Sequence, residues 1–90
     1  MAVTRKNLIG ANVRKLRIEA NMTQDSLAAK LQRGGWDLTR GTLAKIEAGV
    51  RRINDGEVFL LAKGLNKEPS DLMKGIKAPR ALEIARQGKL

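Results

Sequence analysis

Apolar residues recur every three or four positions through most of the chain, which is the period of helices that bury one face. Glycine, asparagine, threonine and proline, residues that begin or end helices, divide the pattern into five units. The positions expected to face the core are Leu8 or Ile9, Val13, Leu16, Leu27, Ala28, Leu31, Leu43, Ile46, Val58, Leu61, Ala62, Leu65 and Leu72. The pattern therefore predicts a compact all-α fold of five helices around an aliphatic core.

Capping residues predict where the middle helices begin. Thr23 and Thr39 precede the second and third units, where a hydroxyl can accept a hydrogen bond from a first-turn N–H group. Asn54, with Glu57 three residues later, predicts a capping box at the start of the fourth unit. Gly49 marks the end of the third.

The two outer helices have different signals. The first is predicted within Met1–Ala20, with Thr4 as its N-cap and Asn21 as its end, because asparagine tolerates the left-handed C-cap conformation. The fifth is a short helix over residues 68–73, where a proline suits the first turn.

Residues 76–90 lie beyond these five units. A helix could begin at Pro79, but Leu82, Ile84 and Ala85 offer too little apolar surface for it to be stable alone. We therefore expect residues 1–75 to form the domain and residues 76–90 to be a basic tail. Disorder is favoured for this tail over a weak helix or a segment that orders on a partner.

Charge adds a partner class to this picture. The chain has 18 Lys and Arg against 9 Asp and Glu, a net charge of +9 and a pI of about 10.7. This balance favours a polyanionic partner, although charge alone does not distinguish a nucleic-acid binder from a protein with an unused basic surface. No stretch is long and apolar enough to span a membrane, and no signal peptide is evident. We expect a cytoplasmic, nucleoid-associated protein.

The chain contains no histidine and no cysteine. Disulfides, thiolate–imidazole metal sites and catalysis by Ser–His or Cys–His pairs are thereby excluded. The nine acidic residues are scattered along the chain. We therefore expect no enzyme activity, no metal, no cofactor and no small-molecule ligand.

One stretch carries a specific motif of two short helices in tandem. It comprises Met22-Thr23-Gln24, Leu27-Ala28, Leu38-Thr39, Thr42-Leu43, Lys45-Ile46-Glu47 and Gly49. With the apolar helices on both sides, this run resembles the Xre-type, lambda-repressor-like helix-turn-helix DNA-binding family over roughly Leu8 to Met73. It departs from the family in the connection Gly34–Leu38, which is longer than the usual tight turn.

The resemblance implies a DNA interface centred on the third predicted helix. The residues expected to contact DNA bases are Arg40, Gly41, Thr42 and Lys45, and those expected to contact phosphates are Thr23, Gln24, Thr39, Arg51 and Arg52. Arg40 suits a guanine edge because two N–H donors match O6 and N7 in the major groove. The resemblance also implies a structural ion pair between Arg17 and Glu47, tying the first helix to the third.

Some of these roles leave alternatives open. Gly41 either lets the backbone approach DNA closely or contacts nothing. A solvated helix face is the alternative for all four residues expected to contact bases, and it is most credible for Lys45. Trp36 is better explained as a cover for the core than as a partner contact. Phe59 and Leu60 add apolar surface to the fourth helix, which the fifth helix, the tail or another subunit would cover.

These observations predict sequence-specific binding of double-stranded DNA by a transcriptional regulator, with repression favoured. A homodimer on a near-palindromic site is implied by the resemblance alone. The main alternative is an antitoxin-like or adaptor module that uses the same fold to bind a partner protein. Non-specific nucleic-acid binding is a further alternative, but the scarcity of aromatic residues argues against stacking on single strands.

Overall fold

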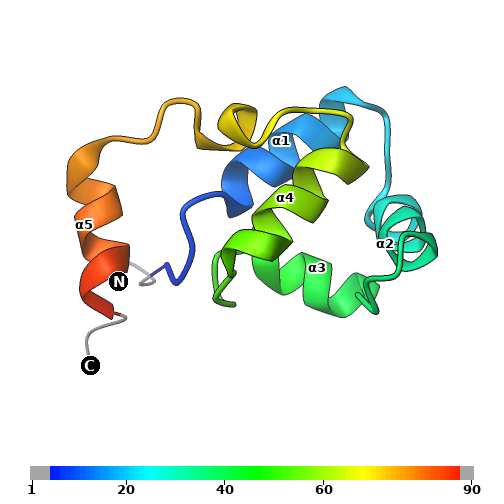
Figure 1. The fold of residues 1–90 in the computed structure, drawn as a ribbon, viewed down its shortest axis with the longest axis horizontal. Coiled ribbons are helices and arrows are strands. Elements are labelled where there is room, and N and C mark those ends of the chain that lie inside the picture. The colour runs from blue at the N-terminus through cyan, green and yellow to red at the C-terminus, as the bar shows by residue number, and fades with distance from the viewer. Residues whose placement is uncertain (1–4, 88–90) are drawn as a thin grey trace.

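The computed structural model describes residues 5–87. Figure 1 shows its helices and their order along the chain. They are α1 (Gly10–Glu19), α2 (Gln24–Arg33), α3 (Arg40–Glu47), α4 (Asp55–Gly64), the 3-10 helix η1 (Pro69–Met73) and α5 (Ala78–Gln87). No strand occurs in this part of the chain, so the predicted all-α fold is confirmed.

The first four helices and η1 pack around one aliphatic core. In this bundle α1 packs on α3, α2 lies across α3 and α4, and η1 closes against α4 and α1. Val13, Leu27, Leu43, Leu61 and Leu72 are fully buried, one from each of these helices. Every position that the apolar pattern assigned to the core is buried or packs against the buried residues.

The predicted caps of the middle helices are present. The Thr23 and Thr39 hydroxyls accept hydrogen bonds from the backbone N–H groups of Ser26 and Thr42, at 3.0 and 3.1 Å. Both hydrogen bonds of the capping box that begins at Asn54 are formed. Local side-chain chemistry therefore determines where α2, α3 and α4 start.

The first helix begins later than expected. It starts at Gly10, and the side chain of Asn7 accepts a hydrogen bond from the Gly10 N–H at 2.8 Å. Thr4, the predicted cap, lies outside the described residues. Residues 5–9 are therefore irregular, bent chain leading into α1, where a continuous helix was expected.

Gly10 permits a very close approach between α1 and α3. A Cβ atom at this position would collide with the carbonyl oxygen of Ile46 and would lie 3.1 Å from that of Glu47. Only a glycine allows the start of α1 to lie directly against the end of α3.

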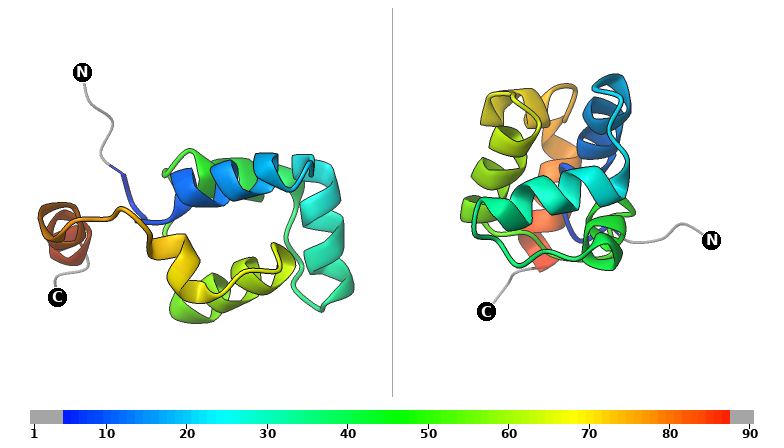
Figure 2. Two further views of the ribbon diagram at one scale, coloured as in Figure 1. Left: turned by 90° about the horizontal axis from the view of Figure 1, so that it is seen from above. Right: turned by 90° about the vertical axis from the view of Figure 1, so that its right-hand side faces the viewer.

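The two C-terminal elements differ from the expectation. The predicted fifth helix is the 3-10 helix η1, and the segment for which disorder was favoured forms the helix α5. None of the ten residues of α5 is buried. Figure 1 and the left view of Figure 2 show α5 standing beside the bundle and not within it.

Candidate nucleic-acid interface

The two sides of α3 have opposite character. Leu43, Ile46 and Glu47 are buried. Arg40, Gly41 and Lys45 are exposed, and Thr42 is half-buried. The core thus holds α3 along one side and leaves the four residues expected to contact bases on its accessible surface.

Arg40 lies at the first turn of α3, beside the start of α2. Its Nε atom is 3.8 Å from a carboxylate oxygen of Asp25, and both side chains are about two-thirds exposed or more. Such a surface ion pair contributes roughly 0–1 kcal/mol, so the Arg40 guanidinium is available to another acceptor at little cost.

A buried ion pair joins α1 to α3. The Arg17 guanidinium donates to both carboxylate oxygens of Glu47, at 2.7 and 3.0 Å, and to the Met22 carbonyl at 2.8 Å. Hydrogen bonding to Glu47 raises the pKa of Arg17 above its ordinary value. The structure therefore brings together the two residues that the resemblance paired, and it buries them.

Gln24 belongs to the same network. Its side-chain amide donates to Glu47 Oε1 at 3.0 Å. A carboxamide nitrogen has two N–H groups, so one remains for another acceptor such as a phosphate. Glu47 thereby fixes the Gln24 side chain at the start of α2, a connection that the sequence analysis did not foresee.

The hydroxyls of Thr23 and Thr39 differ in their freedom. Thr23 accepts a hydrogen bond as the cap of α2, which leaves its O–H group free to donate. Thr39 both accepts from the Thr42 N–H and donates to the Thr42 hydroxyl at 3.0 Å. Of the two, Thr23 is the better placed to donate to a phosphate oxygen.

The structure separates the two arginines that follow α3. Arg51 forms a two-pronged ion pair with Glu57, with both N–O distances 3.0 Å. This hydrogen bonding raises the pKa of Arg51 and lowers the pKa of Glu57 below its ordinary value. Arg52 is exposed, and its Nη2 lies 3.4 Å from the Gln87 carbonyl oxygen. The charge of Arg52 is therefore more available than that of Arg51.

The segment before α1 lies against the loop that contains these arginines. The Lys6 backbone N–H donates to the Gly49 carbonyl at 2.7 Å, and Arg5 donates to the Ala48 carbonyl at 3.2 Å. Both residues were expected within the first helix, with no contact assigned to them. The available signal was Asn7, a good N-cap residue three positions before a helical glycine.

The long connection between α2 and α3 is packed against the bundle. Trp36 is half-buried against the core, and Leu38 is buried directly before the Thr39 cap. Gly35 adopts a positive φ of 102°, the left-handed conformation that glycine tolerates. The connection is longer than a tight turn and still delivers α3 to the side of α2.

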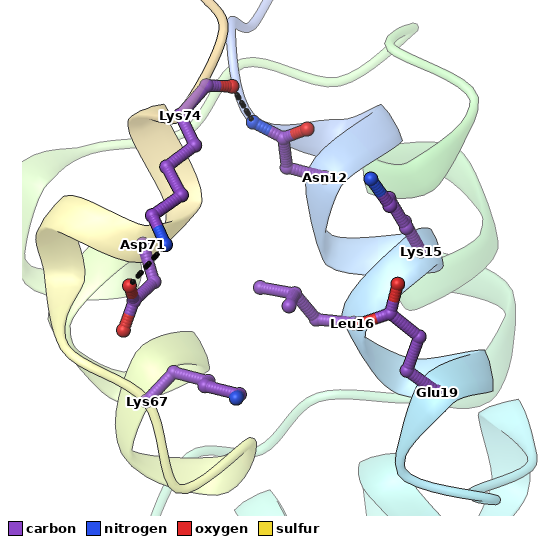
Figure 3. A pocket seen from close by; sticks show the side chains of 7 residues that line it. All are labelled: Asn12, Lys15, Leu16, Glu19, Lys67, Asp71 and Lys74. Atoms are coloured by element: carbon purple, nitrogen blue, oxygen red, sulfur yellow. Dashed lines mark hydrogen bonds and ion pairs between the residues drawn. The ribbon is translucent and has the colours of Figure 1, made fainter.

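A separate pocket of about 250 Å³ lies between α1 and η1. Figure 3 shows three lysines, Lys15, Lys67 and Lys74, lining it together with Glu19 and Asp71. Lys74 lies 3.5 Å from an Asp71 carboxylate oxygen. No residue of α3 lines this pocket, and Figure 1 shows η1 on the other side of the bundle from α3. Because its lining also carries both signs of charge, we do not assign it to the interface around α3.

With this geometry in place, comparison with known proteins identifies the domain. A family model described as helix-turn-helix matches residues 13–72, from the middle of α1 to η1. The chain belongs to the Xre-type helix-turn-helix family. Searches of curated proteins and of solved structures found no match.

Because the chain belongs to this family, it is a DNA-binding helix-turn-helix protein. Members of the family are generally non-catalytic. None of the helices in residues 5–87 is long and apolar enough to cross a membrane. Family membership gives DNA as the partner, and the form of DNA bound, the specificity and the consequences of binding follow as proposals.

Proposed function

We propose that this protein binds double-stranded DNA sequence-specifically and regulates transcription, with repression as its mode. The observation that carries the proposal is the accessible face of α3, held from behind by the buried residues Leu43, Ile46 and Glu47. A helix fixed in this way can enter the major groove while the preceding helix crosses the DNA backbone.

Base recognition is assigned to the accessible face of α3. Arg40 donates two N–H groups to a guanine edge, the pairing that the major groove favours. Thr42 contacts a thymine methyl group or a phosphate, and Lys45 reaches a base or backbone oxygen one turn later. At Gly41 the nearest atom to an added Cβ would be 3.9 Å away, so nothing in the protein requires glycine there. Close approach of the α3 backbone to DNA accounts for it.

Phosphate contacts are assigned to both sides of this helix. Thr23, Gln24 and Thr39 lie at the starts of α2 and α3, where free N–H groups and the helix dipole favour anions. Arg52 and Arg51 follow α3, and Arg51 contributes through the N–H groups that Glu57 leaves unused. Neutralising phosphates releases counterions and supplies much of the affinity, while base contacts supply the choice of site.

Repression would follow from occupancy of the DNA by a homodimer on a near-palindromic site. Two copies related by a two-fold axis present two α3 helices to successive major grooves, about one helical turn apart. This geometry would double the phosphate contacts and so increase both the affinity and its dependence on salt.

Substitution of Arg40 tests the proposal. Arg40→Ala should weaken binding to the preferred duplex by roughly 1–3 kcal/mol and relax the choice at one base pair. Lys30→Ala is the matched control, since it removes one positive charge from α2 outside the assigned contacts. Titration of both variants with preferred and scrambled duplexes separates the cases. Equal weakening on every sequence would make Arg40 a phosphate contact and remove the base-recognition role.

A partner-protein module is the second candidate function. It is favoured by exposed apolar side chains outside the interface, notably Phe59 at 57% and Leu82 at 49% exposure. Replacing both with serine should leave DNA binding unchanged under the DNA-binding proposal. If the substitutions instead abolish a stable complex with a co-purifying protein while DNA shows no sequence preference, the partner-protein function is the correct one.

A further inference from the structure

We infer that Asn7 is a positioning residue for DNA binding, because it fixes the end of α3 to the loop that contains Arg52. This inference rests on the proposed function and names a residue outside the helix-turn-helix that controls its phosphate contacts. Asn7 itself faces the protein interior and is only 5% exposed.

All the hydrogen-bonding capacity of the Asn7 amide nitrogen is used across long sequence separations. Nδ2 donates to the Ile46 carbonyl at 3.1 Å and to the Arg51 carbonyl at 2.8 Å. Oδ1 accepts from the Gly10 N–H at 2.8 Å. One side chain thus joins three points: the start of α1, the last turn of α3 and the loop after α3.

We call these three hydrogen bonds of Asn7 the Asn7 joint, and neighbouring contacts strengthen it. The Lys6 N–H donates to the Gly49 carbonyl, and the Arg5 guanidinium donates to the Ala48 carbonyl. Gly49 has a φ of 80°, and the Arg5 side chain lies where a Cβ of residue 49 would project. Residues 5–7 therefore lie across the loop and hold it from the α1 side.

The joint acts on Arg52 through the backbone. Arg51 directly precedes Arg52, so the hydrogen bond from Asn7 to the Arg51 carbonyl fixes the peptide from which the exposed Arg52 projects. Arg40 lies at the opposite end of α3 and makes no contact with this joint. Losing the two Nδ2 bonds should therefore loosen a phosphate contact and leave base recognition by Arg40 intact.

Serine at position 7 separates these roles of Asn7. A serine hydroxyl can still accept the hydrogen bond from the Gly10 N–H, but it cannot span to the Ile46 and Arg51 carbonyls. Asn7→Ser should thus keep the hydrogen bond to the start of α1 while it releases the loop.

The chain supplies a matched control in Asn12. Its Nδ2 also donates to two backbone carbonyls, those of Leu72 at 2.8 Å and Lys74 at 2.9 Å. Figure 3 shows the second of these bonds, between α1 and the end of η1. Asn12→Ser therefore removes two hydrogen bonds of the same kind, from an asparagine inside α1, without touching α3 or its loop.

The experiment measures the dissociation constant of a preferred duplex at several salt concentrations for the full-length protein, Asn7→Ser and Asn12→Ser. We expect Asn7→Ser to bind about tenfold more weakly, the effect of losing one charge-assisted hydrogen bond. The slope of log K against log salt should fall by about 0.9, the loss of one phosphate contact. The preference for the site over a scrambled duplex should be retained, and Asn12→Ser should bind like the wild type.

A second variant shows whether Asn7 acts through Arg52. In an Arg52→Ala background, Asn7→Ser should cause no further loss beyond about twofold, whereas independent losses that multiply would overturn the inference. If Asn7→Ser does not fold, Asn7→Thr, which is also neutral, keeps a hydroxyl that can accept from the Gly10 N–H and fills more of the space, replaces it in both comparisons.

The outcomes distinguish this inference from the proposed function. If wild type and Asn12→Ser prefer one duplex and Asn7→Ser has the same affinity and salt slope, only the role of Asn7 is refuted. If no variant prefers any sequence, the proposed function fails and the inference fails with it.

Discussion

Two helices of similar length, α3 and α5, are held in the molecule in different ways. Of the eight residues of α3, three are buried, including Glu47 in its ion pair with Arg17. Of the ten residues of α5, none is buried. Apart from those to the adjacent Lys77 carbonyl, its described hydrogen bonds to the rest of the chain run through Gln87, which donates to the Arg5 carbonyl at 2.7 Å and accepts from Arg52. We expect α3 to unfold only with the whole bundle and α5 to open locally at much lower free energy.

The largest effect is expected from the buried ion pair on the α3 side of the comparison. Glu47→Ala leaves the Arg17 guanidinium buried without its partner and frees Gln24, at a cost of about 3–5 kcal/mol in the free energy of unfolding. Chemical denaturation followed by circular dichroism measures this loss. A loss below about 1 kcal/mol would mean that the core alone holds α3 in place.

Substitutions at two glycines test how closely α3 packs against α1. Gly10→Ala places a methyl group against the Ile46 carbonyl and should destabilise the protein by about 1–3 kcal/mol. Gly41→Ala, on the open face of α3, should stabilise it by up to about 1 kcal/mol. Thermal unfolding of the two variants compares them directly. If Gly10→Ala changed the unfolding free energy no more unfavourably than Gly41→Ala, α1 and α3 would have to separate at little cost to admit the methyl group.

The Arg51–Glu57 ion pair predicts that the free energy of unfolding depends on pH in the acid range. Arg51 lowers the folded-state pKa of Glu57 below its ordinary value of 4.5, mainly through their hydrogen bonds. The pair therefore stabilises the fold fully above the unfolded-state pKa, and this contribution is lost as pH falls through the lower folded-state pKa.

Glu57→Gln should remove that part of the dependence of unfolding free energy on pH, below about pH 5. The pKa of Asp71 is lowered mainly by the hydrogen bond from the Glu68 N–H, so Asp71→Asn should remove a separate part of the same acid dependence, independently of the Arg51–Glu57 pair. Parallel pH curves for wild type and Glu57→Gln would show that the Arg51–Glu57 pair is not formed in solution.

The smallest effect is expected on α5. Leu82→Ala removes a side chain that is half exposed, so the unfolding free energy should change by no more than about 0.5 kcal/mol. Leu61→Ala, a fully buried counterpart in α4, should cost about 2–5 kcal/mol. Hydrogen exchange should show α5 amides opening well before those of α3, and equal protection would place α5 within the cooperative unit.

The same contrast explains what the sequence could predict. Leu43 and Ile46 face the core three residues apart, so the apolar period and the Thr39 cap predicted α3 correctly. In α5 the apolar residues Ala78, Leu82 and Ala85 line an open surface, and their number is too small to indicate a stable helix. Its attachment through Gln87 to Arg5 spans 82 residues, which no local pattern reveals.

The candidate site divides in the same way. The outward position of Arg40 and Lys45 follows from helical period, and the structure places both on the accessible face. The partners of Asn7 lie 39 and 44 residues away and are backbone carbonyls, so no residue type marks them. Arg51 was expected to contact a phosphate, but it forms an ion pair with Glu57. That pairing depends on the path of the loop between the two residues, which the sequence pattern does not reveal.

Selection of bound duplexes from a random DNA pool at near-physiological salt is the decisive test of sequence-specific recognition by α3. We expect enrichment of a two-fold symmetric motif, with half-sites about one helical turn apart and at least one guanine position whose preference disappears in Arg40→Ala. A pool that shows no enriched motif, together with binding that vanishes as salt rises, would contradict sequence-specific recognition by α3 and leave only electrostatic attraction to DNA.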